Sequence, residues 1–301
     1  MDATNRVTEA TSADAATYFY DRIDDGPAAD RQQTARARDQ IGSGEGCRDR
    51  NRRIGRSRQG HFVIPGAAQP ALAGDGRHDS AELVDSADIP RGGQLHLIRH
   101  GTDYEILFDE EQLMGSWESG SEVALAVLGC EKLGPKGGRV LIGGLGMGFT
   151  LNAALKALPA ESGVVVAELV PKVVDWAKGP LAHLFGGALD DPRVTIDMRD
   201  VHDVILGSPE GFDAILLDVD NGPDGLIDIA NERLYCNWGL RTAHAALRPG
   251  GVLAVWSAYR DGAFVERLEK AGFTVDEVEV PDEGNPARSP YTIWLASKAA
   301  G

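Results

Sequence analysis

A glycine-rich turn between an apolar strand and a helix restricts the fold of this sequence more than any other feature. Residues 140–148 read Val-Leu-Ile-Gly-Gly-Leu-Gly-Met-Gly, and a helix is predicted to begin at Phe149. Gly144, Gly146 and Gly148 allow a sharp turn and a close approach of the backbone to a ligand, because no Cβ intervenes. The free N–H groups of the following helix favour ligand binding at its N-terminus. The segment therefore predicts a strand–turn–helix unit that holds a ligand.

The spacing of these glycines indicates the kind of ligand. Phe149 stands where the dinucleotide fingerprint G-x-G-x-x-G has its last glycine. This departure argues against NAD and favours an adenosine ligand that lacks a pyrophosphate.

The alternation of strands and helices from residue 134 onward predicts a Rossmann-like, doubly wound and mostly parallel α/β sheet. The predicted strands are 139–142, 164–168, 194–197, 214–218 and 252–257, and the predicted helices are 149–158, 171–178, 201–206, 232–247 and 263–271. Several strands are continuous apolar runs, as is typical of parallel strands that are buried on both faces. Two last strands, 274–280 and 291–296, have no helix between them, which predicts a C-terminal antiparallel hairpin.

The sequence before residue 134 differs from the rest. Residues 1–90 show no sustained hydrophobic period, and an Arg- and Gly-rich stretch at 35–59 predicts a disordered tail or a non-native extension. A chain beginning near Gly92 is expected to keep its full stability. Residues 91–133 are predicted to form a small unit, with a β-hairpin from strands 94–99 and 104–108 and a helix at 121–133. The apolar side of that helix is expected to carry Val123, Val127 and Leu128.

Composition excludes several classes of function. The net charge of −16 makes the chain a poor partner for nucleic acid or an anionic membrane. No apolar run approaches the roughly 18 residues of a membrane span, and the N-terminus shows no signal peptide. Three widely spaced cysteines and seven histidines form no pattern of metal ligands, so no metal is expected. These features favour a cytoplasmic protein that acts on a small molecule, and a homodimer is left open.

Three carboxylates follow successive predicted strands and are the candidates for ligand chemistry. Glu168 lies 20 residues after Gly148, where an acidic side chain can accept hydrogen bonds from both ribose hydroxyls. Asp200 can accept from the amino group of an adenine or can cap the next helix. Asp218 ends the strand that is expected beside the first one, so it can act as a general base or can simply cap a loop.

The chain resembles spermidine synthases, the polyamine aminopropyltransferases that share the fold of class I methyltransferases. The resemblance covers residues 95–296 and rests on the glycine-rich turn, Glu168 with Pro171 behind it, Asp200 and Asp218. The most specific match is Gly-Gly-Ala-Leu-Asp-Asp-Pro-Arg-Val at 186–194, and Leu-Arg-Pro-Gly-Gly at 247–251 supports the fold alone.

The resemblance implies a role for each matching residue. Gly144, Gly146, Gly148 and Glu168 would hold a sulfonium nucleoside, Asp200 would bind its adenine, and Asp218 would deprotonate the attacking amine. The remaining candidates for substrate binding are Asp220 or Asn221 in the loop after Asp218, Glu122 in the segment where the family has His-Glu, and Tyr235.

The residues expected to bind the amine depart from the family pattern. Met147 replaces an aspartate in the glycine-rich turn, and Trp256 stands where the family has a glutamine. The leading hypothesis is therefore aminopropyl transfer from decarboxylated S-adenosylmethionine to an amine or another small nucleophile, with the acceptor left open. The alternatives are methyl transfer from S-adenosylmethionine to a small molecule and a non-catalytic nucleoside-binding protein.

Overall fold

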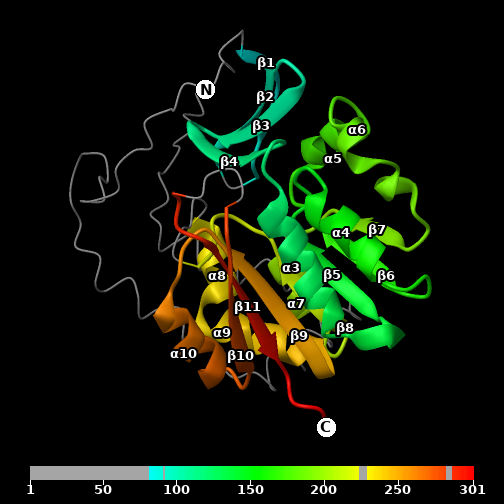
Figure 1. Cartoon of the computed structure of the whole chain (residues 1–301), viewed down its shortest axis with the longest axis vertical. Coiled ribbons are helices and arrows are strands. Elements are labelled where there is room, and N and C mark those ends of the chain that lie inside the picture. The colour runs from blue at the N-terminus through cyan, green and yellow to red at the C-terminus, as the bar shows by residue number, and fades with distance from the viewer. Residues whose placement is uncertain (1–80, 91, 224–228, 283–286) are drawn as a thin grey trace, which may run out of the picture.

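The computed structural model describes residues 81–90, 92–223, 229–282 and 287–301. Two sheets organise this part of the chain, a small antiparallel sheet and a larger, mostly parallel one (Figure 1). The small sheet has the order β1-β2-β3-β4, with bounds Ala81–Asp88, Gln94–His100, Asp103–Phe108 and Glu111–Gly115. The predicted hairpin is thus the centre of a four-stranded sheet.

Strand β1 corrects the expectation that residues 1–90 form a disordered tail. Residues 81–88 pair with β2 in an antiparallel ladder. The strand also contacts the larger domain, since Trp176 Nε1 donates a hydrogen bond of 3.0 Å to Asp85. Residues 82, 85, 86 and 88 are polar, so the segment lacks the alternation of apolar and polar residues that predicts a strand. Residues 1–80 lie outside the described part of the chain.

The larger sheet has the strand order β10-β11-β9-β8-β5-β6-β7. Its parallel part comprises β5 (Arg139–Gly143), β6 (Gly163–Ala167), β7 (Val194–Asp197), β8 (Phe212–Leu217) and β9 (Leu247–Ser257). The antiparallel strands β10 (Thr274–Val280) and β11 (Tyr291–Ser297) extend it beyond β9. The predicted doubly wound sheet with a C-terminal hairpin is confirmed, and β8 lies beside β5 as expected.

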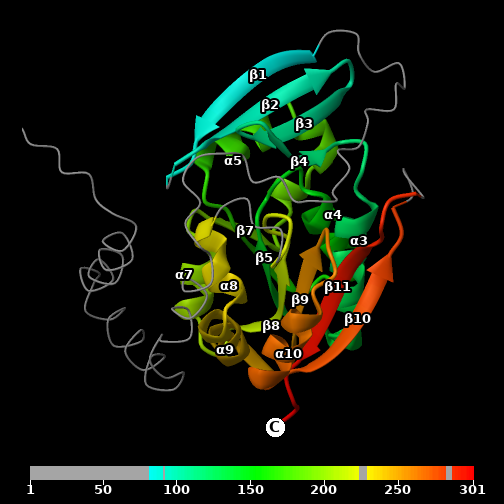
Figure 2. The same ribbon diagram turned by 90° about the vertical axis from the view of Figure 1, so that its left-hand side faces the viewer.

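Helices cover both faces of the larger sheet (Figure 2). One side carries α3 (Gly120–Glu131), α4 (Phe149–Ala157) and α5 (Pro171–Lys178), followed by the short α6 (Ala182–Phe185). The other side carries α7 (Val201–Leu206), α9 (Asn237–Ala246) and α10 (Gly262–Lys270), with the short α8 (Glu232–Tyr235) before α9. Successive residues of the central strands alternate between the two cores. Leu216 and Ala254 face α3, whereas Leu217 and Val255 face α7 and α9.

Two helices differ from their sequence-based predictions. The predicted helix 232–247 is divided into α8 and α9, because Cys236 has an extended backbone with ψ 165°. Helix α3 buries Leu125, Ala126, Gly129 and Cys130, whereas Val123 is exposed and Val127 and Leu128 are only partly buried. Small residues explain this rotation, since a Cβ on Gly129 would lie 2.4 Å from a side-chain atom of Leu216. Among the described residues, no helix is long and apolar enough to cross a bilayer.

Candidate functional site

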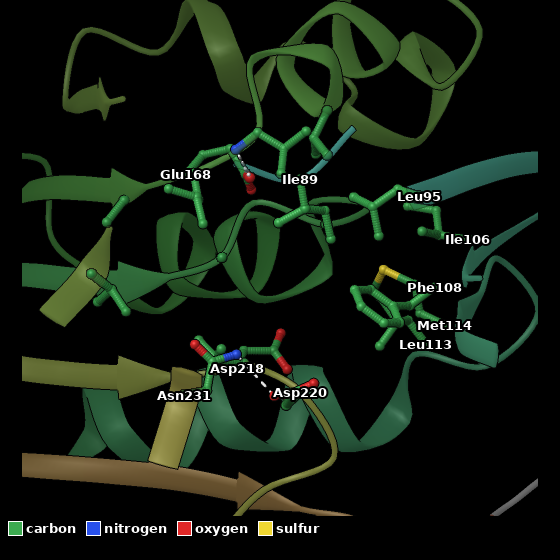
Figure 3. A pocket seen from close by; sticks show the side chains of 18 of the residues that line it. Ile89, Leu95, Ile106, Phe108, Leu113, Met114, Glu168, Asp218, Asp220 and Asn231 are labelled. Atoms are coloured by element: carbon green, nitrogen blue, oxygen red, sulfur yellow. Dashed lines mark hydrogen bonds between the residues drawn. The ribbon is translucent and has the colours of Figure 1, made fainter. Parts of the chain in front are cut away.

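A cavity of about 210 Å³ lies at the carboxyl ends of β5, β6 and β8, between the two sheets. This is the point of a doubly wound sheet where connections leave in opposite directions and ligands bind. Figure 3 shows Glu168 facing Asp218 and Asp220 across the cavity, with an apolar wall beside them. That wall comes from the small sheet and the segments beside it, through Ile89, Leu95, Ile106, Phe108, Leu113 and Met114.

The glycine-rich turn forms one edge of the cavity. Gly144 and Gly146 line it, with φ of 89° and 47°, in the left-handed region that favours glycine. A Cβ on Gly144 would lie 2.8 Å from the carbonyl oxygen of Asp218, so the turn and the end of β8 approach as closely as their backbones allow. Gly148 is not among the lining residues. It packs against Phe185 at the start of α4, where a Cβ would lie 2.4 Å from that ring.

Glu168 is held in place by the backbone around it. Its Oε2 accepts a hydrogen bond of 2.9 Å from Leu145 N–H, and its Oε1 accepts one of 2.8 Å from Val170 N–H. Burial raises the pKa of the carboxyl, and these backbone donors oppose that shift. Leu169 N–H is a third backbone donor to this carboxyl, and the lone-pair capacity that remains is available to a ligand hydroxyl. The predicted ribose-binding residue therefore lies in the cavity in a fixed orientation.

Asp200 also lines the cavity, but both of its oxygens have protein partners. Its Oδ1 accepts a hydrogen bond of 2.9 Å from His202 N–H and so caps α7. Its Oδ2 forms an ion pair with Arg233 from α8. The capping alternative is thus present in the structure, and adenine binding by Asp200 stays a prediction. Sequence reasoning missed Arg233, because nothing in the sequence brings α8 to the N-terminus of α7.

Asp218 follows the last residue of β8 and lies half-buried in the cavity. Thr150, from the first turn of α4, donates a hydrogen bond of 2.5 Å to its Oδ2. Burial raises the pKa of Asp218 to about 6, although the Thr150 bond lowers it. At pH 7 the carboxyl is therefore mostly ionised, and its pKa is close enough to neutral for it to accept and release a proton. Thr150 was missed because only the fold brings it to this strand end.

Glu122 enters the cavity from the first turn of α3. Ser121 Oγ donates a hydrogen bond of 2.7 Å to its Oε2. Burial, followed by repulsion from Asp218, raises the pKa of Glu122 to about 7. Trp256, at the end of β9, lines the same cavity. Glu122 from α3, Asp218 from the end of β8 and Trp256 from β9 therefore line one cavity.

The remaining candidates lie at different places. Asp220 lines the cavity and accepts a hydrogen bond of 2.8 Å from Asn231 Nδ2. Asn221 is not among the lining residues, and its carbonyl oxygen accepts from the backbone N–H of Ala258. Tyr235 lies behind the loop, where its hydroxyl donates a 3.0 Å bond to the carbonyl oxygen of Val219. Of the two alternatives for this loop, the structure therefore brings Asp220 to the cavity.

Among the described residues, no group of three His, Cys, Asp or Glu side chains is arranged to hold a metal ion.

Several curated proteins are similar in sequence to this chain. A polyamine aminopropyltransferase of Mycobacterium tuberculosis (strain CDC 1551 / Oshkosh) is 30% identical over 157 residues, covering 48% of this chain and 29% of that protein. Polyamine aminopropyltransferase 1 of Hyperthermus butylicus is 31% identical over 166 residues, covering 54% and 53%. The chain thus spans between about a third and a half of the length of these relatives. No family model matches it.

Solved structures share the fold over most of the chain. The spermidine synthase of Thermotoga maritima matches with a TM-score of 0.58 and 18% identity, covering 73% of each chain. A spermidine synthase in complex with the transition state analogue AdoDATO matches with a TM-score of 0.59 and 19% identity, covering 73% of this chain and 74% of that one. The chain is thus similar in part of its sequence to polyamine aminopropyltransferases, and its fold is that of the two spermidine synthases.

Proposed function

We propose that the chain transfers an aminopropyl group from decarboxylated S-adenosylmethionine to an amine. The observation that carries the proposal is the pairing of an anchored carboxylate, Glu168, with a half-buried proton acceptor, Asp218, across one cavity. The first suits a ribose and the second suits a nucleophile that must lose a proton. The curated relatives are named polyamine aminopropyltransferases, which favours this transfer among the reactions of the fold.

The cavity suits a nucleoside on physical grounds. Gly144 and Gly146 bring backbone without side chains to the cavity, and Glu168 presents a carboxylate there that its backbone donors hold in place. The apolar wall beside them suits a base or a thioether. We therefore assign Gly144, Gly146 and Glu168 to the sulfonium nucleoside, with Asp200 at the adenine edge.

Group transfer at this site needs orientation and removal of a proton. The bound nucleoside supplies a sulfonium, which is already a good leaving group. The neutral amine nitrogen forms a bond to the carbon beside sulfur, while the carbon–sulfur bond breaks and its electron pair stays on sulfur. The products are methylthioadenosine and the lengthened amine. Asp218 accepts the proton that the amine loses, and the walls hold nitrogen and carbon in line.

Product analysis on purified protein tests the proposal. Methylthioadenosine released from the decarboxylated cofactor with an amine present supports aminopropyl transfer. S-adenosylhomocysteine formed from S-adenosylmethionine would indicate methyl transfer instead. Trp256 favours that second candidate, because an indole stands in the cavity wall where the family has a glutamine. Release of neither product would leave a nucleoside-binding protein and would overturn the proposal.

The variant Asp218→Asn tests the role of the base within this proposal. Asparagine cannot accept the proton, so turnover is expected to fall by roughly 10²–10⁴. Methylthioadenosine affinity should stay within a few-fold, because Glu168 and the glycine-rich turn are unchanged. Asp220→Asn is the matched control and should lose less. Full activity of Asp218→Asn with a lower melting temperature would show that the carboxyl is structural.

A further inference from the structure

Glu122 lies on the same side of the larger sheet as Asp218 and Trp256. Leu217 and Val255 are register partners in β8 and β9, so Asp218 and Trp256 occupy neighbouring positions at the two strand ends. Trp256 packs in the core that faces α3, and Glu122 comes from the first turn of α3. All three residues line the cavity. Figure 3 shows the corner of the cavity around Asp218 and Asp220.

The surroundings of Glu122 bear on its protonation. Asp218 faces it from β8, and Glu118 adds a weaker repulsion from the segment before α3. Ser121 donates to Glu122 and Thr150 donates to Asp218, and Asp220 in the loop beyond β8 lines the same cavity. Glu122 is buried and Asp218 is half-buried in the same cavity. Because the charge of Asp218 makes Glu122 harder to ionise, a cation between the two carboxyls would favour their ionised forms.

A separate observation shows that this corner is built for a ligand. The indole Nε1 of Trp256 is buried, and it has no hydrogen-bond partner in the described part of the chain. The residue itself is only 8% exposed, and the cavity is the space that it lines. A buried donor is destabilising unless an acceptor reaches it. An ammonium ion has no lone pair to offer this N–H, but the nitrogen of a neutral amine, once its proton is removed, can accept from it.

We propose that Glu122 and Asp218 together form the acceptor subsite, in which they bind one cationic amine and share the proton that it gives up. This inference rests on the proposed function and adds a second acid to it. An alkylammonium ion enters and transfers one proton to the carboxyl pair. The neutral nitrogen then attacks the carbon beside sulfur, and the pair releases the proton to solvent after the product leaves. Glu122 thereby supplies an acidic contact for the amine, and Met147 in the glycine-rich turn offers none.

Calorimetry on the full chain loaded with methylthioadenosine tests this subsite, with butylamine and 1,4-diaminobutane as probes. We expect Glu122→Gln to weaken the binding of both amines at least tenfold and to leave methylthioadenosine affinity unchanged. Glu122→Asp keeps the charge and should recover part of the loss. Glu131→Gln, an exposed glutamate at the other end of α3, is the matched control and should bind the amines as the wild type does.

Proton counting separates a binding role from a structural one. At pH 6.5 the wild type should release protons when an amine binds, because the ammonium favours the ionised form of Glu122. Titrations in buffers of different ionisation enthalpy measure that release, and it should shrink in Glu122→Gln. Equal amine affinity and equal proton release in both proteins would overturn the proposal, as would a wild type that binds no amine. Amine binding without methylthioadenosine formation would instead refute the proposed function and leave the subsite standing.

Discussion

Burial of Glu122, Glu168 and Asp218 destabilises the folded chain at neutral pH. For each of them burial raises the pKa, so the folded protein favours the protonated acid. A group of this kind contributes stability that is fully present below its unfolded pKa and is lost as the pH rises through its folded pKa. The acids that we assign to ligands therefore cost stability where they are ionised, as is common at functional sites.

Glu122→Gln is accordingly expected to stabilise the protein at high pH. The pKa of Glu122 rises from 4.5 to about 7, which corresponds to roughly 3 kcal/mol at 1.36 kcal/mol per unit. The stability of the variant relative to wild type should thus increase by about 2–3 kcal/mol between pH 5 and pH 8. Urea unfolding at both pH values measures this difference, and Glu131→Gln should show none. An equal loss of stability at both pH values would mean that the carboxylate is needed for packing.

Gly144 gives a second prediction at the scale of a residue. Alanine there would adopt a φ of 89° and would place its Cβ 2.8 Å from the carbonyl oxygen of Asp218. We expect Gly144→Ala to lose roughly 1–3 kcal/mol of stability and to weaken methylthioadenosine binding, since the turn must move away from β8. Gly163→Ala, in β6, has open space around the added Cβ and is the control. Unchanged binding by Gly144→Ala would show that the turn does not contact the nucleoside.

At the scale of elements, the parallel strands could be predicted from the sequence, whereas the orientation of α3 could not. Strands β5, β6 and β8 are apolar runs buried on both faces. Such a strand can be recognised from its own residues, without knowing which elements pack against it. The buried side of α3 is instead set by how closely the helix approaches β8 and β9. Its contact face combines Leu125 and Ala126 with Gly129, so small size rather than hydrophobicity marks it.

The same distinction explains the candidate site. Glu168, Asp200 and Asp218 lie at or just after the ends of predicted strands, so their position at one edge of the sheet could be predicted from the sequence. Thr150 and Arg233 reach that edge from helices whose rotation and breaks depend on packing. The break before α9 lies at Cys236, whose backbone is extended, and Cys236 and Asn237 are both weak helix formers.

The orientation of α3 can be tested with a pair of truncations. Leu125→Ala removes a fully buried side chain and is expected to cost about 2–5 kcal/mol. Val123→Ala changes a side chain that is 38% exposed and should cost well under 1 kcal/mol. Chemical unfolding of the two variants measures both values. A larger loss of stability for Val123→Ala than for Leu125→Ala would show that Val123 faces the core, as the sequence predicts.

At the scale of the whole molecule, the cavity depends on contact between the two sheets. Met114 from β4 lies against the glycine-rich turn, since a Cβ on Gly146 would be 2.9 Å from its sulfur. On the other side, Asp85 of β1 accepts a hydrogen bond from Trp176 and pairs with Lys172 of α5. The small sheet therefore forms a wall of the cavity rather than a separate appendage.

Removal of β1 tests this dependence and reverses the expectation that a chain beginning at Gly92 is fully stable. Two chains are compared, one beginning at Ser80 and one at Gly92, so that both lack residues 1–79 and differ only in β1 and the turn after it. The shorter chain loses the ladder to β2, the Asp85–Trp176 hydrogen bond and Ile89 of the cavity wall. We expect its melting temperature to fall by more than about 5 °C, since 1 kcal/mol shifts a domain of this size by roughly 2–4 °C. Methylthioadenosine should also bind more weakly to it.

Trp176→Phe in the longer chain isolates the contact between β1 and α5. Phenylalanine fills most of the space of the indole but cannot donate to Asp85, so this variant should lose only part of the stability that removal of β1 costs. Its methylthioadenosine affinity should remain close to that of the parent, because Ile89 stays in the wall. Equal melting temperatures for the chains beginning at Ser80 and Gly92 would show that β1 packs on the molecule without stabilising it. Equal methylthioadenosine affinities would show that the nucleoside does not reach the wall that β1 and Ile89 support.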